Sequence, residues 1–321
     1  MRLEYGVIVN STETYRFAMK ESPFATGCNA QTIPKALRHM YLPPPGRMFV
    51  QGDLSQAEAR IVAYLANCHD LIELFNDPKR SVHLENALAV FGHAVEKDTP
   101  EYTLAKAVIH ASHYREGPIK FSVQTGLPVK EAKRLLANYH GKRPEIRQWH
   151  QRVYDTVRQT GKLTSPLGDE RVFYEALGAF SMFGKMTDQQ WKDAIAWTPQ
   201  TTVPHITNLG ILNLAKLDCG QWWHHQGHDS FMVSIEPGQY VKFCSQVPKA
   251  FNIPVVIGRY ELMLPLELSG GYNFGDMMPY DGSALPYAKW LKWLDGKLVK
   301  QSRTAQILAG TYGVHLKDWR P

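Results

Sequence analysis

The segment Arg47-Met-Phe-Val-Gln-Gly-Asp-Leu-Ser-Gln-Ala-Glu-Ala-Arg60 decides the fold that we expect for this chain. Its first half is short and apolar and follows Pro43-Pro-Pro-Gly46, so it predicts a strand that ends at Asp53. The second half predicts a helix, with Ser55 as its N-cap and Glu58 as the capping-box partner. The order is therefore strand, carboxylate, helix.

A second carboxylate, Asp229, lies in a predicted hairpin. The runs Gln221-Trp-Trp-His-His-Gln226 and Ser230-Phe-Met-Val-Ser-Ile235 favour strands, and the turn between them holds His228 and Asp229. Carboxylates at two strand ends suit Mg²⁺, and two such ions about 4 Å apart support an in-line displacement at phosphorus. For either aspartate alone, the competing interpretation is a helix cap or a turn residue.

Composition narrows the class of protein. The 321 residues are 44% hydrophobic and 21% charged, as in globular proteins. No apolar run reaches the roughly 18 residues of a membrane span, and we expect neither membrane insertion nor export. Four cysteines without a CxxC pair fit a reducing compartment. The net charge of +6 suits a polyanionic partner such as nucleic acid.

The residues between the two carboxylates are mostly helical in character. From Asp70 to about Thr160 apolar residues recur at helical spacing, which predicts a helical insertion. The stretch Ser165–Tyr174 predicts two short strands joined by a turn, and Thr207–Leu217 predicts a helix. Pro254–Ile257 predicts a further strand, and Leu264–Leu268 follows it. The sequence therefore indicates an α+β fold.

Three motifs in this order resemble those of family A DNA polymerases. Gly52–Arg60 resembles motif A, Lys106 and Tyr114 have the spacing of motif B, and Gly227–Asp229 resembles motif C. The resemblance covers roughly residues 12–276. Weaker landmarks keep the same order: Thr14-Tyr-Arg16, Asn29–Pro34, His83, Gln200 and Asn273.

The resemblance implies a right-hand polymerase fold, bacterial polymerase I-like and phage-type. Its palm is an antiparallel sheet with helices, formed by residues 1–60 and 191–276, and the mainly helical fingers are residues 61–190. Residues 277–321 form an extension, either a helix that docks a partner or DNA or a plain closing helix. We expect the thumb and exonuclease domains to be absent, so that the chain is a fragment or a split subunit with a separate protein supplying them.

The activity implied is template-directed DNA synthesis with two Mg²⁺ ions, which Mn²⁺ can replace, in the cytoplasm of a bacterium or a phage-infected cell. Primer-template DNA and dNTPs are the implied partners. Asp53, Asp229 and the Leu54 carbonyl are the implied metal ligands, and Lys106 completes the catalytic set. Glu58 would exclude a ribose 2′-hydroxyl, although it can instead serve only as the partner of Ser55.

The resemblance also assigns two binding sets. The nucleotide-binding set is Leu54, Ser55, Gln56, Glu58, His83, Tyr102, Lys106, His110 and Tyr114. The DNA-binding set is Arg16, Gln31, Arg60, Lys192, Gln200 and His228. Tyr102, Lys106, His110 and Tyr114 recur every four residues and so share one helical face. The competing interpretation makes Tyr114 a core aromatic and Lys106 a solvated lysine.

Four residues depart from the family pattern. The family has Arg in place of Tyr102, an aromatic residue in place of His110, Gly in place of Arg115 and commonly Glu in place of Ser230. We still expect activity, but Tyr102, His110 and Ser230 motivate an alternative function, a catalytically weakened polymerase-derived DNA-binding subunit that needs a partner chain.

Two other hypotheses use the histidines. One is a metal phosphohydrolase based on the pair His228 and Asp229. The other is a zinc cluster of His224, His225, His228 and Cys219. The alternation of side chains along a strand disfavours the zinc cluster.

Overall fold

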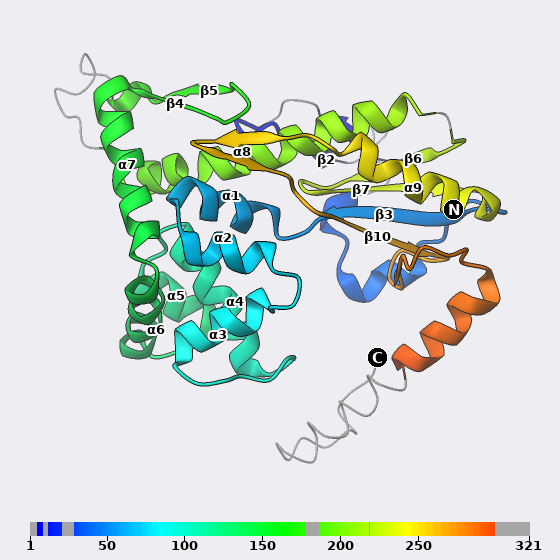
Figure 1. Cartoon of the computed structure of the whole chain (residues 1–321), viewed down its shortest axis with the longest axis horizontal. Helices are drawn as coiled ribbons and strands as arrows, with labels where there is room; N and C mark the ends of the chain where they lie inside the picture. The colour runs from blue at the N-terminus through cyan, green and yellow to red at the C-terminus, as the bar shows by residue number, and fades with distance from the viewer. Residues whose placement is uncertain (1–4, 9–11, 21–28, 177–185, 218, 299–321) are drawn as a thin grey trace.

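The computed structural model describes residues 5–8, 12–20, 29–176, 186–217 and 219–298. It has two lobes (Figure 1), and the predicted α+β class is confirmed. The sheet lobe is built on a five-stranded antiparallel sheet in the order β11-β10-β3-β7-β6. Its strands are β3 (Met48–Leu54), β6 (Trp222–Gln226), β7 (Ser230–Ile235), β10 (Leu266–Gly271) and β11 (Met278–Pro279).

The helical lobe is formed by helices between β3 and β6 in the chain. The first helices are α1 (Ala57–Ala66), α2 (His69–Asn76), α3 (Val82–Phe91) and α4 (Pro100–His113). They are followed by α5 (Pro118–Thr125), α6 (Val129–Lys142) and α7 (Pro144–Thr160). This lobe contains the helical insertion that the sequence predicts.

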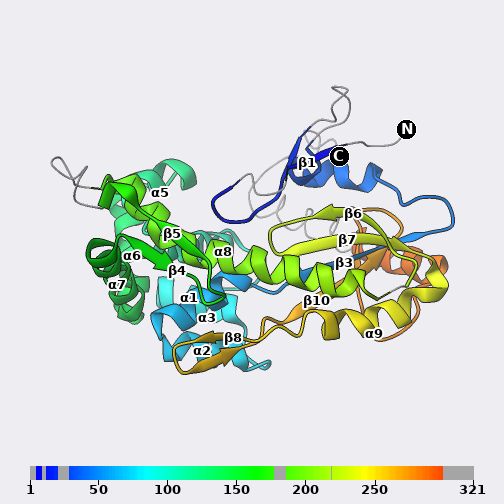
Figure 2. The same ribbon diagram turned by 90° about the horizontal axis from the view of Figure 1, so that it is seen from above.

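Two helices complete the sheet lobe, α8 (Asp188–Ala215) and α9 (Tyr240–Ala250). Figure 2 shows α8 running from the helical lobe along the strands of the sheet. The sequence predicted only the last part of α8, because Pro199 and Pro204 lie inside it. Neighbouring threonine hydroxyls bond to carbonyls one turn back, as Thr202 does to Thr198 at 2.7 Å.

Smaller elements connect these parts. Three two-stranded hairpins are β1 (Gly6–Ile8) with β2 (Ala18–Lys20), β4 (Lys162–Thr164) with β5 (Glu170–Val172), and β8 (Val255–Ile257) with β9 (Tyr260–Leu262). Single 3₁₀ turns are Ala30–Thr32, Lys35–Met40, Tyr174–Ala176 and Pro237–Gln239. Residues 287–298 form a last helix, whose Trp290 is buried and donates to the Asp276 carbonyl at 2.8 Å.

The two faces of β3 have different surroundings. Met48, Val50 and Leu54 point into the main hydrophobic core. Phe49 belongs to a separate small cluster with Met232 and Phe274. Because side chains alternate along a strand, Asp53 lies on the face of Phe49, away from the main core.

Gly52 has no room for a side chain. A Cβ atom there would lie 2.4 Å from the Phe231 ring, which is fully buried on β7. Phe231 in turn stacks on Phe251 at the end of α9, with 5.3 Å between ring centroids. The backbone just before Asp53 is therefore fixed by close packing.

The start of α1 corrects one prediction. The helix begins at Ala57, and its N-cap is Gln56 in a left-handed conformation, not Ser55. The Ser55 backbone is engaged elsewhere, since its N–H donates to the Pro265 carbonyl at 2.8 Å and its carbonyl accepts from Arg60 at 3.1 Å. The capping box is therefore absent, and Glu58 is free to make other contacts.

Candidate active site

Strand register brings the two predicted aspartates together. Asp53 pairs with Ser230 across β3 and β7, so Asp229 is one residue from the partner of Asp53. The Leu54 N–H donates to the Asp229 carbonyl at 2.7 Å, which fixes the end of β3 against the hairpin turn. The turn is also held from α8, where the Thr207 hydroxyl donates to the His228 carbonyl at 3.0 Å. Both aspartates are half-buried.

Glu267 is a third carboxylate that sequence reasoning missed. It lies on β10, directly opposite Asp53 on the other side of β3. Opposed residues of antiparallel strands have their Cβ atoms roughly 4.5–5.5 Å apart on one face. Burial, Asp229 and Glu267, in that order, raise the pKa of Asp53 to about 7. The sequence around Glu267 does not show that this residue pairs with Asp53, which comes more than 200 positions earlier in the chain.

The electrostatics of this face fit a bound cation. Burial also raises the pKa of Asp229, while backbone hydrogen bonding opposes that shift. Within the described ranges, no three His, Cys, Asp or Glu side chains converge on one metal position. Carboxylate oxygens are ligands that Mg²⁺ prefers, and Asp53 and Asp229 are the predicted pair that strand register brings together.

A cavity of about 390 Å³ opens between α1, α3 and α4 and reaches Asp229. Six of the nine predicted nucleotide-binding residues line it: Gln56, Glu58, His83, Lys106, His110 and Tyr114. Leu54, Ser55 and Tyr102 do not. The lining also includes Asn86, which is buried and whose Oδ1 has no hydrogen-bond partner in the described part of the chain. Asn86 was missed, although it lies one helical turn after His83 on α3.

Glu58 is held in place by residues from two other segments. Arg16 donates to its Oε1 at 2.6 Å, and the Tyr114 hydroxyl donates to its Oε2. The side chain of Gln200 on α8 in turn hydrogen-bonds to Tyr114. Burial, followed by the charge of Glu58, raises the pKa of Tyr114 well above its usual value. The carboxylate of Glu58 is thus fixed at the wall of the cavity.

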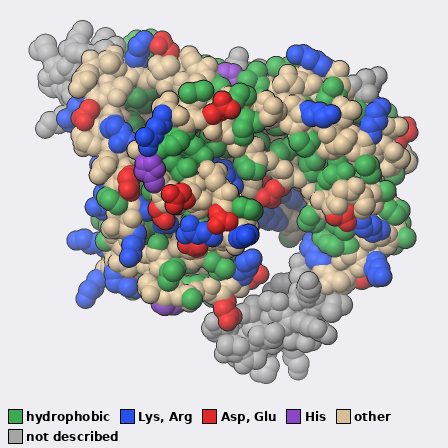
Figure 3. Space-filling model, in the orientation of Figure 1, with side chains coloured by type: hydrophobic (Ala, Val, Ile, Leu, Met, Phe, Trp, Pro, Cys, Tyr) green, Lys and Arg blue, Asp and Glu red, His purple; other side chains and the backbone are tan. Residues whose placement is uncertain are grey.

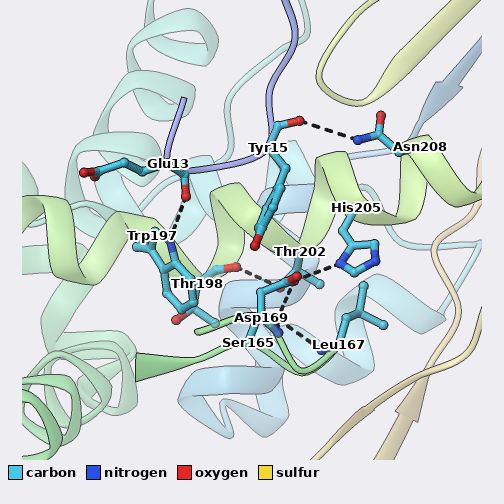
Figure 4. A network of polar contacts seen from close by, with 10 residues as sticks. All are labelled: Glu13, Tyr15, Ser165, Leu167, Asp169, Trp197, Thr198, Thr202, His205 and Asn208. Atoms are coloured by element: carbon cyan, nitrogen blue, oxygen red, sulfur yellow. Dashed lines mark hydrogen bonds and ion pairs between the residues drawn. The ribbon is translucent and has the colours of Figure 1, made fainter. Parts of the chain in front are cut away.

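The segment that carries Arg16 is tied to α8 (Figure 4). The Trp197 indole donates to the Glu13 carbonyl at 3.0 Å, and the Asn208 amide to the Tyr15 carbonyl at 3.5 Å. Below them His205 contacts Asp169 of the β4–β5 turn at 2.8 Å. These contacts join the N-terminal segment, α8 and the β4–β5 turn, and so place Arg16 beside Glu58.

The shared face of α4 is divided between cavity and core. Lys106 and His110 are exposed in the cavity, and the His110 ring meets Tyr114 edge-on at 4.9 Å. Tyr102 is 8% exposed and packs with Ala87, Val95 and Ala105 between α3 and α4. The competing interpretation expected Tyr114 to be the core aromatic, but Tyr114 lines the cavity and Tyr102 is the buried aromatic of this face.

The predicted DNA-binding residues have different surroundings. Arg60 is buried, and its guanidinium donates to the carbonyls of Ser55 and Phe75, so it ties the start of α1 to the end of α2. Gln31 links the carbonyls of Phe17 and Gln226. Lys192 pairs with Asp188 at 2.6 Å. His228 is exposed at the hairpin turn.

The surface seen in Figure 3 is hollowed between the helical lobe and the sheet lobe. Lys and Arg side chains occur on both lobes on this face. In the described part of the chain, no helix is both long and apolar enough to cross a membrane.

Comparisons with known proteins agree with this geometry. Residues 8–276 match the family described as DNA polymerase family A. A DNA polymerase of Mycobacterium phage D29 is 29% identical over 146 residues, which are 44% of this chain and 24% of that protein. DNA polymerase I of Helicobacter pylori strain 26695 is 27% identical over 68% of this chain and 24% of that protein.

A solved structure shares the fold. The POL domain of Pol1 from M. smegmatis, in complex with DNA primer-template and dNTP, superposes with a TM-score of 0.72 at 21% identity. The match covers 85% of this chain and 48% of that one. The chain thus spans about a quarter of the length of the two curated relatives. The family match covers most of the chain and includes both aspartates, and the chain belongs to DNA polymerase family A.

Proposed function

We propose that this chain catalyses magnesium-dependent, template-directed transfer of dNMP from a dNTP to a primer 3′-hydroxyl. The observation that carries the proposal is the register of β3 and β7, which sets Asp53 beside Asp229, and Asp229 lines the cavity. In this proposal the sheet lobe is the palm and the helical lobe is the fingers.

Asp53, Asp229 and the Leu54 carbonyl would hold two Mg²⁺ ions, which Mn²⁺ can replace. Bound ions would activate the primer hydroxyl and neutralise charge on the reacting phosphate. The raised pKa of Asp53 supports this role, because unneutralised negative charges face one another there.

The chain's own residues would position the substrates. Lys106 and His83 would contact the outer phosphates, where a lysine ammonium offsets charge that develops during transfer. Glu58, fixed by Arg16 and Tyr114, would occupy the space that a ribose 2′-hydroxyl needs. Gln200 and His228 would contact the primer-template duplex.

The experiment is extension of a labelled primer-template by this chain with either dNTPs or rNTPs, beside the Asp229→Ala variant. We expect Mg²⁺-dependent extension with dNTPs that the variant loses. A matched control is Asp155→Asn, because Asp155 is exposed on α7 and contacts only Gln151. Extension by Asp229→Ala at the wild-type rate would contradict the proposal.

A second candidate is a DNA-binding subunit without catalysis. It is favoured by Ser230 beside Asp229 and by the burial of Tyr102, where the family pattern has charged residues. The same assay separates the two functions. Tight binding of primer-template by well-folded protein, with no extension at any Mg²⁺ or Mn²⁺ concentration, would support the second function and exclude the first.

A further inference from the structure

The end of the cavity between α3 and α4 holds a cation that forms no ion pair with an acidic side chain of the described residues. Lys106 lines the cavity, and no carboxylate lies within ion-pair distance of it among the residues that the structure describes. Its ammonium instead lies over the ring of Tyr102, 4.3 Å from the ring centroid. A cation so placed is attracted by the negative face of the ring.

His83 is the second polar group at this end. Its ring meets Tyr102 edge-on, with 5.8 Å between centroids and 80° between planes. Its Nδ1 is buried and has no hydrogen-bond partner in the described ranges. Burial, and then the charge of Lys106, lower the pKa of His83, so its imidazole is neutral at pH 7. Lys106 and His83 are therefore close neighbours with unused hydrogen-bonding capacity.

Tyr102 contacts both residues but does not line the cavity. It is anchored in the small cluster of Ala87, Val95 and Ala105, which fixes the position of its ring. Its hydroxyl makes no hydrogen bond to the described residues. The Tyr102 ring is thus fixed in place and contacts one charged group, Lys106, and one neutral group, His83.

We propose that Tyr102 is a positioning residue, whose ring holds Lys106 and His83 so that together they bind a polyphosphate anion, the triphosphate of a nucleotide. This inference rests on the proposed function for the identity of the nucleotide. A lysine stem has several rotatable bonds, and a fixed ammonium loses less entropy when the anion binds.

Three variants test whether the ring of Tyr102 is needed, as distinct from its hydroxyl and from the cluster that surrounds it. Tyr102→Phe keeps the ring and removes only the hydroxyl. Tyr102→Leu removes the ring face. Val95→Ala is the matched control, because Val95 belongs to the same cluster but is not among the residues that line the cavity.

The first measurement is the Kd of the full chain for inorganic tripolyphosphate, by calorimetry and without DNA. We expect wild type, Tyr102→Phe and Val95→Ala to agree within about twofold, and Tyr102→Leu to bind about tenfold more weakly. In a Lys106→Gln background, Tyr102→Leu should have no further effect, because the ring acts through the lysine. Wild-type affinity in folded Tyr102→Leu, or an undiminished loss in the Lys106→Gln background, would overturn the inference.

The second measurement is the NMR signal of the Lys106 ε-methylene, assigned by its disappearance in Lys106→Gln. A ring beneath the ammonium shifts this signal upfield in wild type and in Tyr102→Phe, and the shift should vanish in Tyr102→Leu. An unshifted signal in wild type would overturn the inference. Tyr102-dependent tripolyphosphate binding by a chain that never extends a primer would uphold the inference while excluding the proposed function.

Discussion

The sheet lobe and the helical lobe carry the two halves of the proposed site in different ways. In the sheet lobe, Asp53 and Asp229 are fixed by strand register, and Phe231 leaves no room for a side chain at Gly52. In the helical lobe, the proposed nucleotide contacts are side chains of separate helices, with His83 on α3 and Lys106 and His110 on α4. The departures at Tyr102 and His110 are both in this lobe. Strand pairing thus fixes the two carboxylates, whereas the proposed nucleotide contacts depend on helix side chains that differ from the family pattern.

The largest effect on primer extension should come from a substitution in the sheet lobe. We expect Asp53→Asn to slow single-turnover primer extension by about a thousandfold or more, because a metal ligand is lost. Without metal at pH 8, it should also stabilise the fold by about 1 kcal/mol, since an unneutralised charge is removed and solvent screening reduces the gain. Rapid quench and thermal unfolding in EDTA measure the two effects. Unchanged extension or a lower Tm would contradict the assignment.

Glu58 joins the lobes, because α1 of the helical lobe carries it and Arg16, whose segment is tied to α8 of the sheet lobe, donates to it. We expect Glu58→Ala to reduce the preference for dNTPs over rNTPs by about a hundredfold, mainly by raising kcat/KM for rNTPs. Tyr114→Phe keeps the carboxylate but removes one hydrogen bond, so its effect should be smaller. The ratio of kcat/KM values measures the preference. If Glu58→Ala leaves that ratio at its wild-type value, Glu58 has only a structural role.

The helical lobe should be the more acid-sensitive one, because it carries three buried histidines with strongly lowered pKa values, whereas the sheet lobe has His225 on β6, whose pKa burial lowers to about 4. Burial lowers the pKa of His113 to about 3 and those of His140 and His150 to about 4. The unfolded chain binds protons on these groups below about pH 6.5, so stability is lost as the pH falls from 6.5 towards 4. We expect a loss of about 3 kcal/mol between pH 7 and pH 5.

The raised pKa of Asp53 has the opposite sign, because the folded state takes up a proton there first. The pH series is therefore best measured by urea unfolding in the Asp53→Asn background. His150→Gln should make the free energy of unfolding depend less steeply on pH. A stability that rises from pH 7 to pH 5 in that background would contradict the histidine account.

The smallest effect should be at Arg115, where the family pattern has Gly. Arg115 adopts a φ of 55°, which is unfavourable for a side chain, and pairs with Asp188 at 2.7 Å on the surface. Arg115→Gly relieves the backbone but loses the pair and the contact with the Tyr154 ring. These terms are each about 1 kcal/mol or less, so we expect the free energy of unfolding to change by less than about 1 kcal/mol. A loss above about 2 kcal/mol would show that this contact holds α4 in place.

The sequence predicted the sheet lobe well where the signal was local. Strand β3, the hairpin around Asp229 and the helical insertion all follow from short-range patterns, and each is confirmed. Glu267 was not predicted as part of the site, because its place opposite Asp53 depends on pairing with a distant strand. The Ser55 cap was wrong because tertiary contacts engage the Ser55 backbone.

In the helical lobe, the sequence did not show which residues of a helix face are buried. Helical spacing gave one face to Tyr102, Lys106, His110 and Tyr114, but spacing alone does not tell which end of that face is buried. The packing of α3 against α4 buries Tyr102 and leaves Lys106 exposed above it. The spacing of residues along α4 does not show that α3 packs against it.

The most direct test of the account counts the metal ions at Asp53 and Asp229. Mn²⁺ binding is followed by electron paramagnetic resonance with a primer that lacks a 3′-hydroxyl and the matching dNTP. The account predicts about two bound ions per chain in wild type and fewer, bound more weakly, in Asp53→Asn and Asp229→Asn. Equal Mn²⁺ binding in wild type and both variants would contradict it.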